Sequence, residues 1–447
     1  MKIEVIPSAS RLINSLRDIG YSFNDAVADI IDNSIEALST VISINIVFNG
    51  KDSYLTICDN GNGLKGIEIQ EAMRFGSNRN YSSNEDLGRF GLGLKTASLS
   101  QCERLTVSSR IGDERIRINS YCWDLEHISN TNKWEIIKID KENLKEEILL
   151  HFKNTTGTAI TWERLDRLLE YKYPNGESAK KQLELMTEDL KNHLGMIFHR
   201  FLSGEIYNKR IAIYINEVRV PPWDPFSRGE KDTDVLDEIR LPIDHSNGIA
   251  IVKVQPYILP NQSSYSSTKA HSTASGPQKW NKQQGLYIYR SNRIIQSGGW
   301  NALRTSDEHT KLLRIAVFIP QQIEEFFQVN VSKKHVILPS QLRSHLSNYL
   351  KIIISKAQDK YRDRLISENQ KNLIDHKTSK VDKINEMEVN NLIETLIKFT
   401  KLETSQSDIS NFINDLILNS NSAEKSILIN IIKKTALQKI NANGNSH

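Results

Sequence analysis

A chain of 447 residues with 25% charged and 38% hydrophobic residues is long enough for about three domains and too apolar to be disordered throughout. Lysine and arginine exceed the acidic residues by only 58 to 54, which permits contact with nucleic acid without arguing for it. No run of about 18 apolar residues occurs, so a conventional membrane-spanning helix is excluded. The three scattered cysteines do not form a disulfide framework or a zinc site, and the N-terminus lacks an apolar signal core. A cytoplasmic location without membrane contact is therefore expected.

The first 170 residues predict a mixed α and β domain. Hydrophobic periodicity favours helices around Ser8–Leu16 and from Asn24 to Leu38, and strands at Val41–Phe48, Tyr54–Cys58, Leu105–Ser109 and Arg115–Ile118. Residues 171–350 repeat the mixture, with a helix at Leu183–Phe201 and strands at Ile211–Ile215, Leu286–Tyr289 and Leu313–Ile319. The polar stretch Asn261–Gln284 within this region is interpreted as a mobile surface loop.

Residues 351–447 are built differently, because they contain no proline and a single glycine, Gly444. Apolar residues recur at helical spacing in 389–397 and in 409–417, and a third helix is expected after Ser422. Short amphipathic helices must bury their apolar stripes, so this segment predicts a helical module that binds a protein partner. The fold class of the whole chain is therefore α+β with an all-α C-terminal module.

The helix that begins near Asn24 has a polar side opposite its apolar one. Asp29 and Asn33 are one turn apart on that polar side. A carboxylate and an amide at this spacing can hold a hydrated Mg²⁺ and orient a water molecule at the same time. The alternative is an ordinary solvent-exposed face.

Three glycine-containing segments follow. One of them, directly after the apolar strand Leu55–Cys58, is Asp59-Asn60-Gly61-Asn62-Gly63. It places a carboxylate at the end of a sheet, and its glycines let the backbone approach a flat ligand. The alternative is a plain turn. Gly88, Gly91 and Gly93 precede a helix-like run that contains Lys95, which indicates a phosphate cradle. The spacing fits neither the P-loop nor the dinucleotide fingerprint. Gly157-Thr158, which opens a strand, is uninformative alone.

The order and spacing of these four segments together resemble the Bergerat nucleotide-binding fold of the GHKL superfamily, which includes DNA gyrase B, the large heat-shock chaperone, sensor histidine kinases and MutL. The resemblance covers residues 1–350 and is strongest to the MORC-like and MutL-like branch, including bacterial MORC-like proteins, because Gly88–Lys95 is similar to the MORC lid. It implies a Bergerat-type α/β sandwich ATPase domain at 1–170, a transducer domain at 171–350 and the helical interaction module at 351–447.

The resemblance also implies a Mg²⁺-dependent ATPase and assigns roles to residues of this chain. The implied nucleotide contacts are Asp59 for the adenine amino group with Thr158 behind it, Gly61 and Gly63 for the turn, Asn33 for Mg²⁺, Gly88, Gly91 and Gly93 for a closing lid, and Lys95 for phosphate. The general base of the family is usually a glutamate, and here Asp29 holds its place with an arm one methylene shorter. Either hydrolysis is slower or the water lies closer.

Residues Val329–Val336 resemble the MutL transducer segment from which a lysine enters the ATP site, although the His-Pro of that segment is missing here. Lys333 is preferred over Lys334 for this role, and the alternative is a basic surface strand. No endonuclease motif of MutL proteins and no phosphorylatable histidine followed by an acid occur in the sequence.

The resulting hypothesis is an ATP-hydrolysing clamp that dimerises when ATP binds, with Met1–Arg11 docking across the homodimer. The clamp would act on double-stranded DNA or in a DNA-associated complex for antiviral defence or repair. One alternative is a protein-remodelling or signalling ATPase whose helical tail binds a client. Another is a nucleotide-gated scaffold with little hydrolysis.

Overall fold

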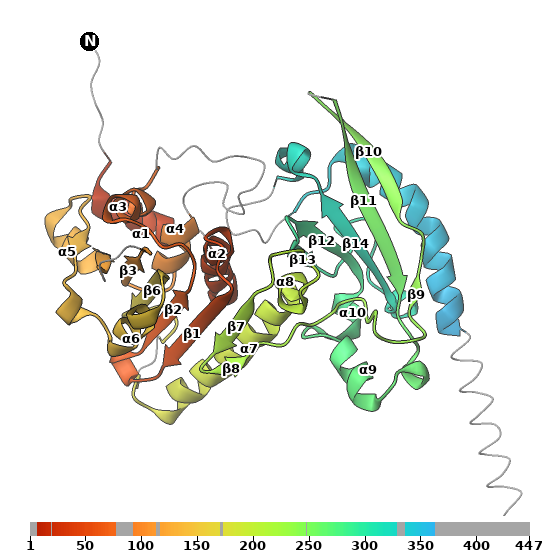
Figure 1. Cartoon of the computed structure of the whole chain (residues 1–447). Helices are drawn as coiled ribbons and strands as arrows, with labels where there is room; N and C mark the ends of the chain where they lie inside the picture. Colours follow the sequence, from red (N-terminus) through yellow and green to blue (C-terminus); the bar gives the residue numbers. More distant parts are fainter. Residues whose placement is uncertain are drawn as a thin grey trace, which may run out of the picture. The chain divides into compact units, whose positions relative to one another are not determined.

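The computed structural model describes residues 7–18, 20–76, 93–112, 117–169, 173–246, 248–328 and 336–362. The chain divides into two compact units, Met1–Arg364 and Leu365–His447, and every described residue belongs to the first. Two β-sheets with helices packed against them form the described part (Figure 1), which confirms the α+β class. The helices expected at 389–397, at 409–417 and after Ser422 lie outside the described residues.

The first sheet contains eight strands in the order β5-β4-β3-β6-β2-β1-β7-β8. Their bounds in chain order are β1 Val41–Val47, β2 Tyr54–Asp59, β3 Arg104–Arg110, β4 Asn119–Asp124, β5 Ile137–Lys138, β6 Gly157–Glu163, β7 Ala212–Ile215 and β8 Val218–Arg219. Neighbouring strands are antiparallel except β1 and β7, which are parallel. The sheet thus includes strands from both sides of residue 170, and the domain boundary expected there stays a prediction.

Helices cover both faces of the centre of this sheet. Those of the first 170 residues are α1 Ala9–Arg17, α2 Phe23–Glu36, α3 Gly66–Met73, α4 Gly93–Leu99, α5 Leu125–Thr131 and α6 Glu146–Asn154, and they are followed by α7 Glu177–Ile197 and α8 His199–Ser203. Ile31 of α2 packs in the main core with Ile57 of β2, whereas Phe152 of α6 packs with Cys58 and Ala159 in a separate small core. Since adjacent strand residues point to opposite faces, β2 and β6 are buried on both sides.

The second sheet has the order β10-β11-β14-β12-β13, with β9 paired to β11. Its strands are β9 Asp234–Val235, β10 Ile239–His245, β11 Gly248–Ile258, β12 Gly285–Arg290, β13 Arg293–Ser297 and β14 Leu313–Ile319. A helix over residues 340–362 packs against this sheet through Leu342, Leu346 and Leu350. Short 3₁₀ helices lie at Gly50–Asp52, Lys141–Asn143, Gln262–Ser264, Glu308–Thr310 and Gln321–Phe327.

Two local predictions differ from the structure. Of the strand expected at Arg115–Ile118, residues 117–118 are not part of a strand and residues 115–116 lie outside the described residues; the strand that follows is β4 Asn119–Asp124, where Cys122 and Trp123 are buried. The stretch interpreted as a mobile loop, Asn261–Gln284, instead contains α9 Thr268–Ala274 and α10 Lys279–Gln283. The buried Arg314 holds this stretch in place, because its guanidinium lies over the Trp280 ring and donates a 2.6 Å hydrogen bond to the carbonyl of Ala274. A distant buried cation that binds backbone carbonyls leaves no signal in local composition.

Candidate nucleotide-binding site

The carboxylate of Asp59 lies at the end of β2 and is held by donors from three segments of the chain. Its Oδ1 accepts hydrogen bonds from the backbone N–H of Gly61 at 2.9 Å and of Thr158 at 3.2 Å, and its Oδ2 accepts one from Ser34 Oγ at 3.0 Å. Burial raises the pKa of Asp59, and these three hydrogen bonds oppose the rise because they favour the ionised form. The structure therefore brings together Asp59, Gly61 and Thr158, three residues to which the family resemblance assigns nucleotide contacts.

The glycines around Asp59 permit close backbone contact. Gly157 has a φ of +131°, and a Cβ there would lie 1.8 Å from the carbonyl oxygen of Asp59. Gly63 has a φ of +71°, and a Cβ there would lie 2.1 Å from the carbonyl oxygen of Arg110. Both values are far below any van der Waals contact, so only glycine fits at these positions.

Hydroxyl groups continue this arrangement behind the carboxylate. Thr158 Oγ1 is 3.0 Å from Ser109 Oγ, which also donates to the Gly157 carbonyl at 2.7 Å and accepts from the Leu64 N–H at 2.8 Å. On the face covered by α6, His151 Nε2 is 2.9 Å from the carbonyl oxygen of Asp59. Sequence reasoning missed Ser34, Ser109 and His151, because nothing in their local sequence distinguishes them from structural residues.

Asp29 and Asp32 of α2 are buried, with exposures of 4% and 1%, so the alternative of an exposed polar face does not hold for them. Tyr21 donates a 2.7 Å hydrogen bond to Asp29 Oδ2. Burial and the nearby Asp29 carboxylate raise the pKa of Tyr21, so its hydroxyl stays protonated and remains a donor. Asn33, one turn further along the helix, is exposed.

A cation from the second sheet faces these two carboxylates. Nη2 of Arg293 is 3.6 Å from Asp29 Oδ1, and its Nη1 is 3.2 Å from Asp32 Oδ2. Arg293 is the first residue of β13 and is 3% exposed. Sequence reasoning missed this residue as well.

Gly93 begins α4 beside Asp29, since a Cβ on it would lie 3.5 Å from Asp29 Oδ2. Lys95, two residues later, is buried, and its Nζ donates to the carbonyls of Ala72 at 2.9 Å and Arg74 at 2.8 Å. These carbonyls belong to the C-terminal end of α3, where the last backbone carbonyls of a helix have no N–H donor within the helix. Burial lowers the pKa of Lys95 to about 8. Gly88, Gly91 and Lys333 lie outside the described residues.

Comparison with known proteins agrees with this geometry. Residues 21–158 match the family described as histidine kinase-, DNA gyrase B- and HSP90-like ATPases. A segment of 91 residues is 30% identical to Protein MICRORCHIDIA 5 of Arabidopsis thaliana, covering 19% of this chain and 13% of that protein. The matched family range contains Asp29, Asp59, Lys95 and Thr158.

Residues 21–158 therefore form a GHKL-type ATPase domain, and a 91-residue segment of the chain is similar to one MORC protein. Among the helices of the described ranges, none combines the length and apolar character needed to cross a bilayer. Within the same ranges, no three His, Cys, Asp or Glu side chains are grouped as a metal site. A magnesium ion held mainly by phosphate and water oxygens does not need such a group, since one or two protein ligands suffice.

Proposed function

We propose that the chain is a Mg²⁺-dependent ATP hydrolase that works as a molecular clamp. The observation that carries this proposal is the buried Asp59 carboxylate, fixed by Gly61, Ser34 and Thr158 at the end of β2. An ionised carboxylate accepts hydrogen bonds only, so it pairs with the amino group of adenine and repels the carbonyl oxygen that guanine carries at the same position. The site should therefore select ATP over GTP.

The phosphate end of the site would lie at the start of α4, where Gly93 is next to Asp29. Asp29 would orient the attacking water and take its proton, and Asn33 would supply the protein ligand to Mg²⁺, which neutralises phosphate charge when it is bound. Gly88 and Gly91 would complete the lid, and Lys333 would contact the terminal phosphate. Lys95 would have to exchange the carbonyls of α3 for phosphate oxygens in order to pair with the nucleotide.

The clamp would form when ATP binding joins two copies of the chain, with Met1–Arg11 docked across. The clamp would act on double-stranded DNA, in a cytoplasmic defence or repair complex, as the resemblance of the Gly88–Lys95 segment to the MORC lid implies. The C-terminal helices would bind a protein partner, and a client bound there is the alternative to DNA.

A second candidate, a nucleotide-gated scaffold with little hydrolysis, is favoured by one contact. Tyr21 donates to the oxygen of Asp29 that also faces Gly93. While this bond persists, that oxygen is less able to take a proton from water. The aspartate side chain is also one methylene shorter than glutamate, which lowers the expected rate of hydrolysis further. Slow turnover with tight ATP binding is the expected behaviour of such a protein.

The test is ATP turnover by the full chain, with and without double-stranded DNA, beside Asp29→Asn and Asp59→Asn. We expect turnover that Asp29→Asn abolishes, and stimulation by DNA that weakens as salt rises. Turnover indifferent to DNA would favour the protein-client alternative. ATP binding without turnover in the wild type would establish the scaffold, and equal binding of ATP and GTP would overturn the role of Asp59.

A further inference from the structure

The hairpin of β12 and β13 delivers one buried guanidinium to the helix that carries Asp29. Residues Ser291 and Asn292 have φ values of 45° and 70°, and Arg290 pairs with Arg293 across them. Two successive positive φ values make a tight two-residue hairpin turn whose twist matches the strands. The turn therefore fixes the backbone position from which the Arg293 side chain extends.

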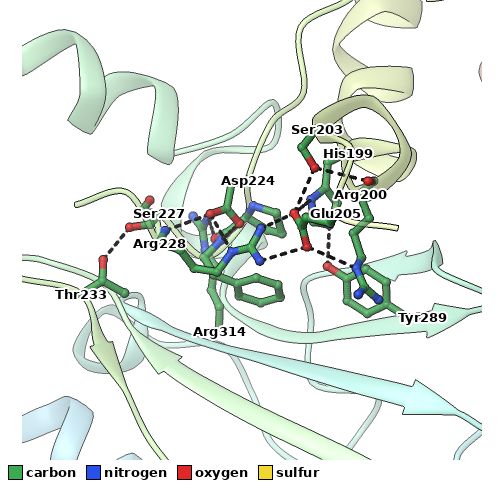
Figure 2. A network of polar contacts seen from close by, with 12 residues as sticks. His199, Arg200, Ser203, Glu205, Asp224, Ser227, Arg228, Thr233, Tyr289 and Arg314 are labelled. Atoms are coloured by element: carbon green, nitrogen blue, oxygen red, sulfur yellow. Dashed lines mark hydrogen bonds and ion pairs between the residues drawn. The ribbon is translucent and has the colours of Figure 1, made fainter. Parts of the chain in front are cut away.

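Contacts with α8 hold this hairpin in place. Arg200 donates a 2.6 Å hydrogen bond from Nη1 to the side chain of Asn292 in the turn. Figure 2 shows His199 and Arg200 of α8 beside Tyr289 of β12, and His199 Nε2 is 2.7 Å from the Tyr289 hydroxyl. Burial lowers the pKa of His199 to about 4, so this contact is between neutral groups at physiological pH. The guanidinium of Arg293 also lies over the ring of Phe198, 5.7 Å from its centroid.

The positions of the two aspartates create an electrostatic requirement. Asp29 and Asp32 are three residues apart on α2, and both are almost completely buried. Two carboxylates that close together in a low-dielectric environment repel each other strongly unless a cation compensates their charge. Arg293 provides that cation, with one nitrogen toward each carboxylate. A planar guanidinium supplies a positive charge and also N–H donors in fixed directions, whereas a lysine ammonium supplies the charge without fixed directions.

We infer that Arg293 is a positioning residue for ATP hydrolysis, which orients the Asp29 carboxylate from the second sheet through its ion pairs with Asp29 and Asp32, so that hydrolysis depends on how that sheet is docked. This inference rests on the proposed function, in which Asp29 is the base. It predicts that Arg293 acts on the chemical step and contributes little to nucleotide binding, because its contacts are to carboxylates of α2 and not to the Asp59 pocket.

The experiment measures kcat in steady state and the Kd of ATP by calorimetry for the full-length wild type, Arg293→Gln and Arg293→Lys. We expect Arg293→Gln to lower kcat by about 10-fold or more while the Kd changes by less than about 3-fold. Arg293→Lys should recover part of kcat, because it restores the charge without the planar fork. If Arg293→Gln does not fold, Arg293→Lys serves as the test: we expect its kcat to be lower than that of the wild type and its Kd for ATP to be unchanged.

Arg290→Gln is the matched control. Arg290 lies at the other side of the same turn, is also buried and pairs with Glu324 at 2.8 Å. Its loss should destabilise the hairpin to a similar extent yet leave kcat within about 2-fold of the wild type.

An Arg293→Gln variant with wild-type kcat would overturn the inference while leaving the proposed ATPase intact. A parallel loss in kcat and ATP affinity would also overturn it, since Arg293 would then be a nucleotide ligand. An equal fall of kcat in Arg290→Gln would reduce Arg293 to a structural residue. A wild type that binds ATP without turnover would instead refute the proposed hydrolysis and the inference with it.

Discussion

Ser34 on α2 donates a hydrogen bond to Asp59 at the end of β2, with 3.0 Å between Oγ and Oδ2. Ser34 lies five residues after Asp29 on the same helix, and both side chains are buried. The helix that would carry the catalytic base is thereby connected directly to the carboxylate that would recognise adenine. In the proposed mechanism, recognition of the base and orientation of the water would therefore depend on one rigid element.

Replacement of this hydroxyl tests the connection. Ser34→Ala removes a donor to the ionised Asp59 and should raise the pKa of Asp59 further, since hydrogen bonds to a carboxylate favour its charged form. We expect the free energy of unfolding to fall by about 1 kcal/mol and the Kd of ATP to rise by about 5-fold. Ser39→Ala is the control, because the buried Ser39 bonds Val41 and Asn60 instead. Equal ATP affinity in the two variants would contradict the prediction.

Asp59→Asn should weaken ATP binding by about 10-fold or more and relax the preference for ATP over GTP. The carboxamide offers an N–H donor in place of a carboxylate oxygen, so it can meet the guanine carbonyl that the carboxylate repels. Calorimetric titration with both nucleotides measures the change. Asp140→Asn, at an exposed position, should leave both affinities unaltered. A variant that kept the full preference for ATP would place base recognition elsewhere.

Gly157→Ala should be among the most damaging single substitutions in the first sheet. The added methyl would lie 1.8 Å from the Asp59 carbonyl oxygen at a φ of +131°. We expect a loss of about 3 kcal/mol or more in the free energy of unfolding, measured by urea denaturation. Gly229→Ala serves for comparison, because a Cβ there meets nothing within 4 Å and should cost less than about 0.5 kcal/mol. Similar midpoints of urea denaturation for Gly157→Ala and Gly229→Ala would show that the backbone around residue 157 accommodates the added methyl group easily.

Lys95 predicts a pH dependence of stability. Its pKa is lowered by burial to about 8 in the folded chain, against 10.5 for an unperturbed lysine. Between these values the unfolded chain binds more protons than the folded chain, so the contribution of Lys95 to stability rises with pH. The free energy of unfolding of the wild type, minus that of Lys95→Met, should therefore increase between pH 8 and pH 10. A difference that stayed flat, or fell, would mean that Lys95 keeps its charge in the folded protein.

The parts of the site that could be predicted are those encoded within short segments. Asp59, Gly61 and Gly63 follow one strand within a few residues, and Gly157-Thr158 begins another. The pairing of β2 with β6 then brings Thr158 to Asp59. Strand periodicity and glycine spacing are local properties that a single sequence shows, and the resemblance of the four segments to the GHKL superfamily adds a role to Gly157-Thr158, which is uninformative alone.

Arg293 could not be predicted in this way. Its contact with Asp29 spans the two sheets, and its own surroundings, Ser291-Asn292-Arg293, indicate only a turn followed by a charged residue. The burial of Asp29 and Asp32 was missed for a related reason, because charged residues on a helix normally face solvent unless a partner is supplied from elsewhere. The ion pairs with Arg293 permit the burial of Asp29 and Asp32, and Arg293 is far from both of them in the sequence.

The parallel pairing of β1 with β7 has a practical consequence for work with fragments. A fragment cut at residue 158, where the family match ends, would lack β7 and leave the backbone groups of β1 unpaired along one side. Ile42 and Ile44 of that strand would lose the neighbours Ile213 and Ile215. Open, apolar strand edges promote aggregation. A well-behaved recombinant nucleotide-binding fragment therefore has to extend at least to Arg219, well past the region that sequence similarity marks out.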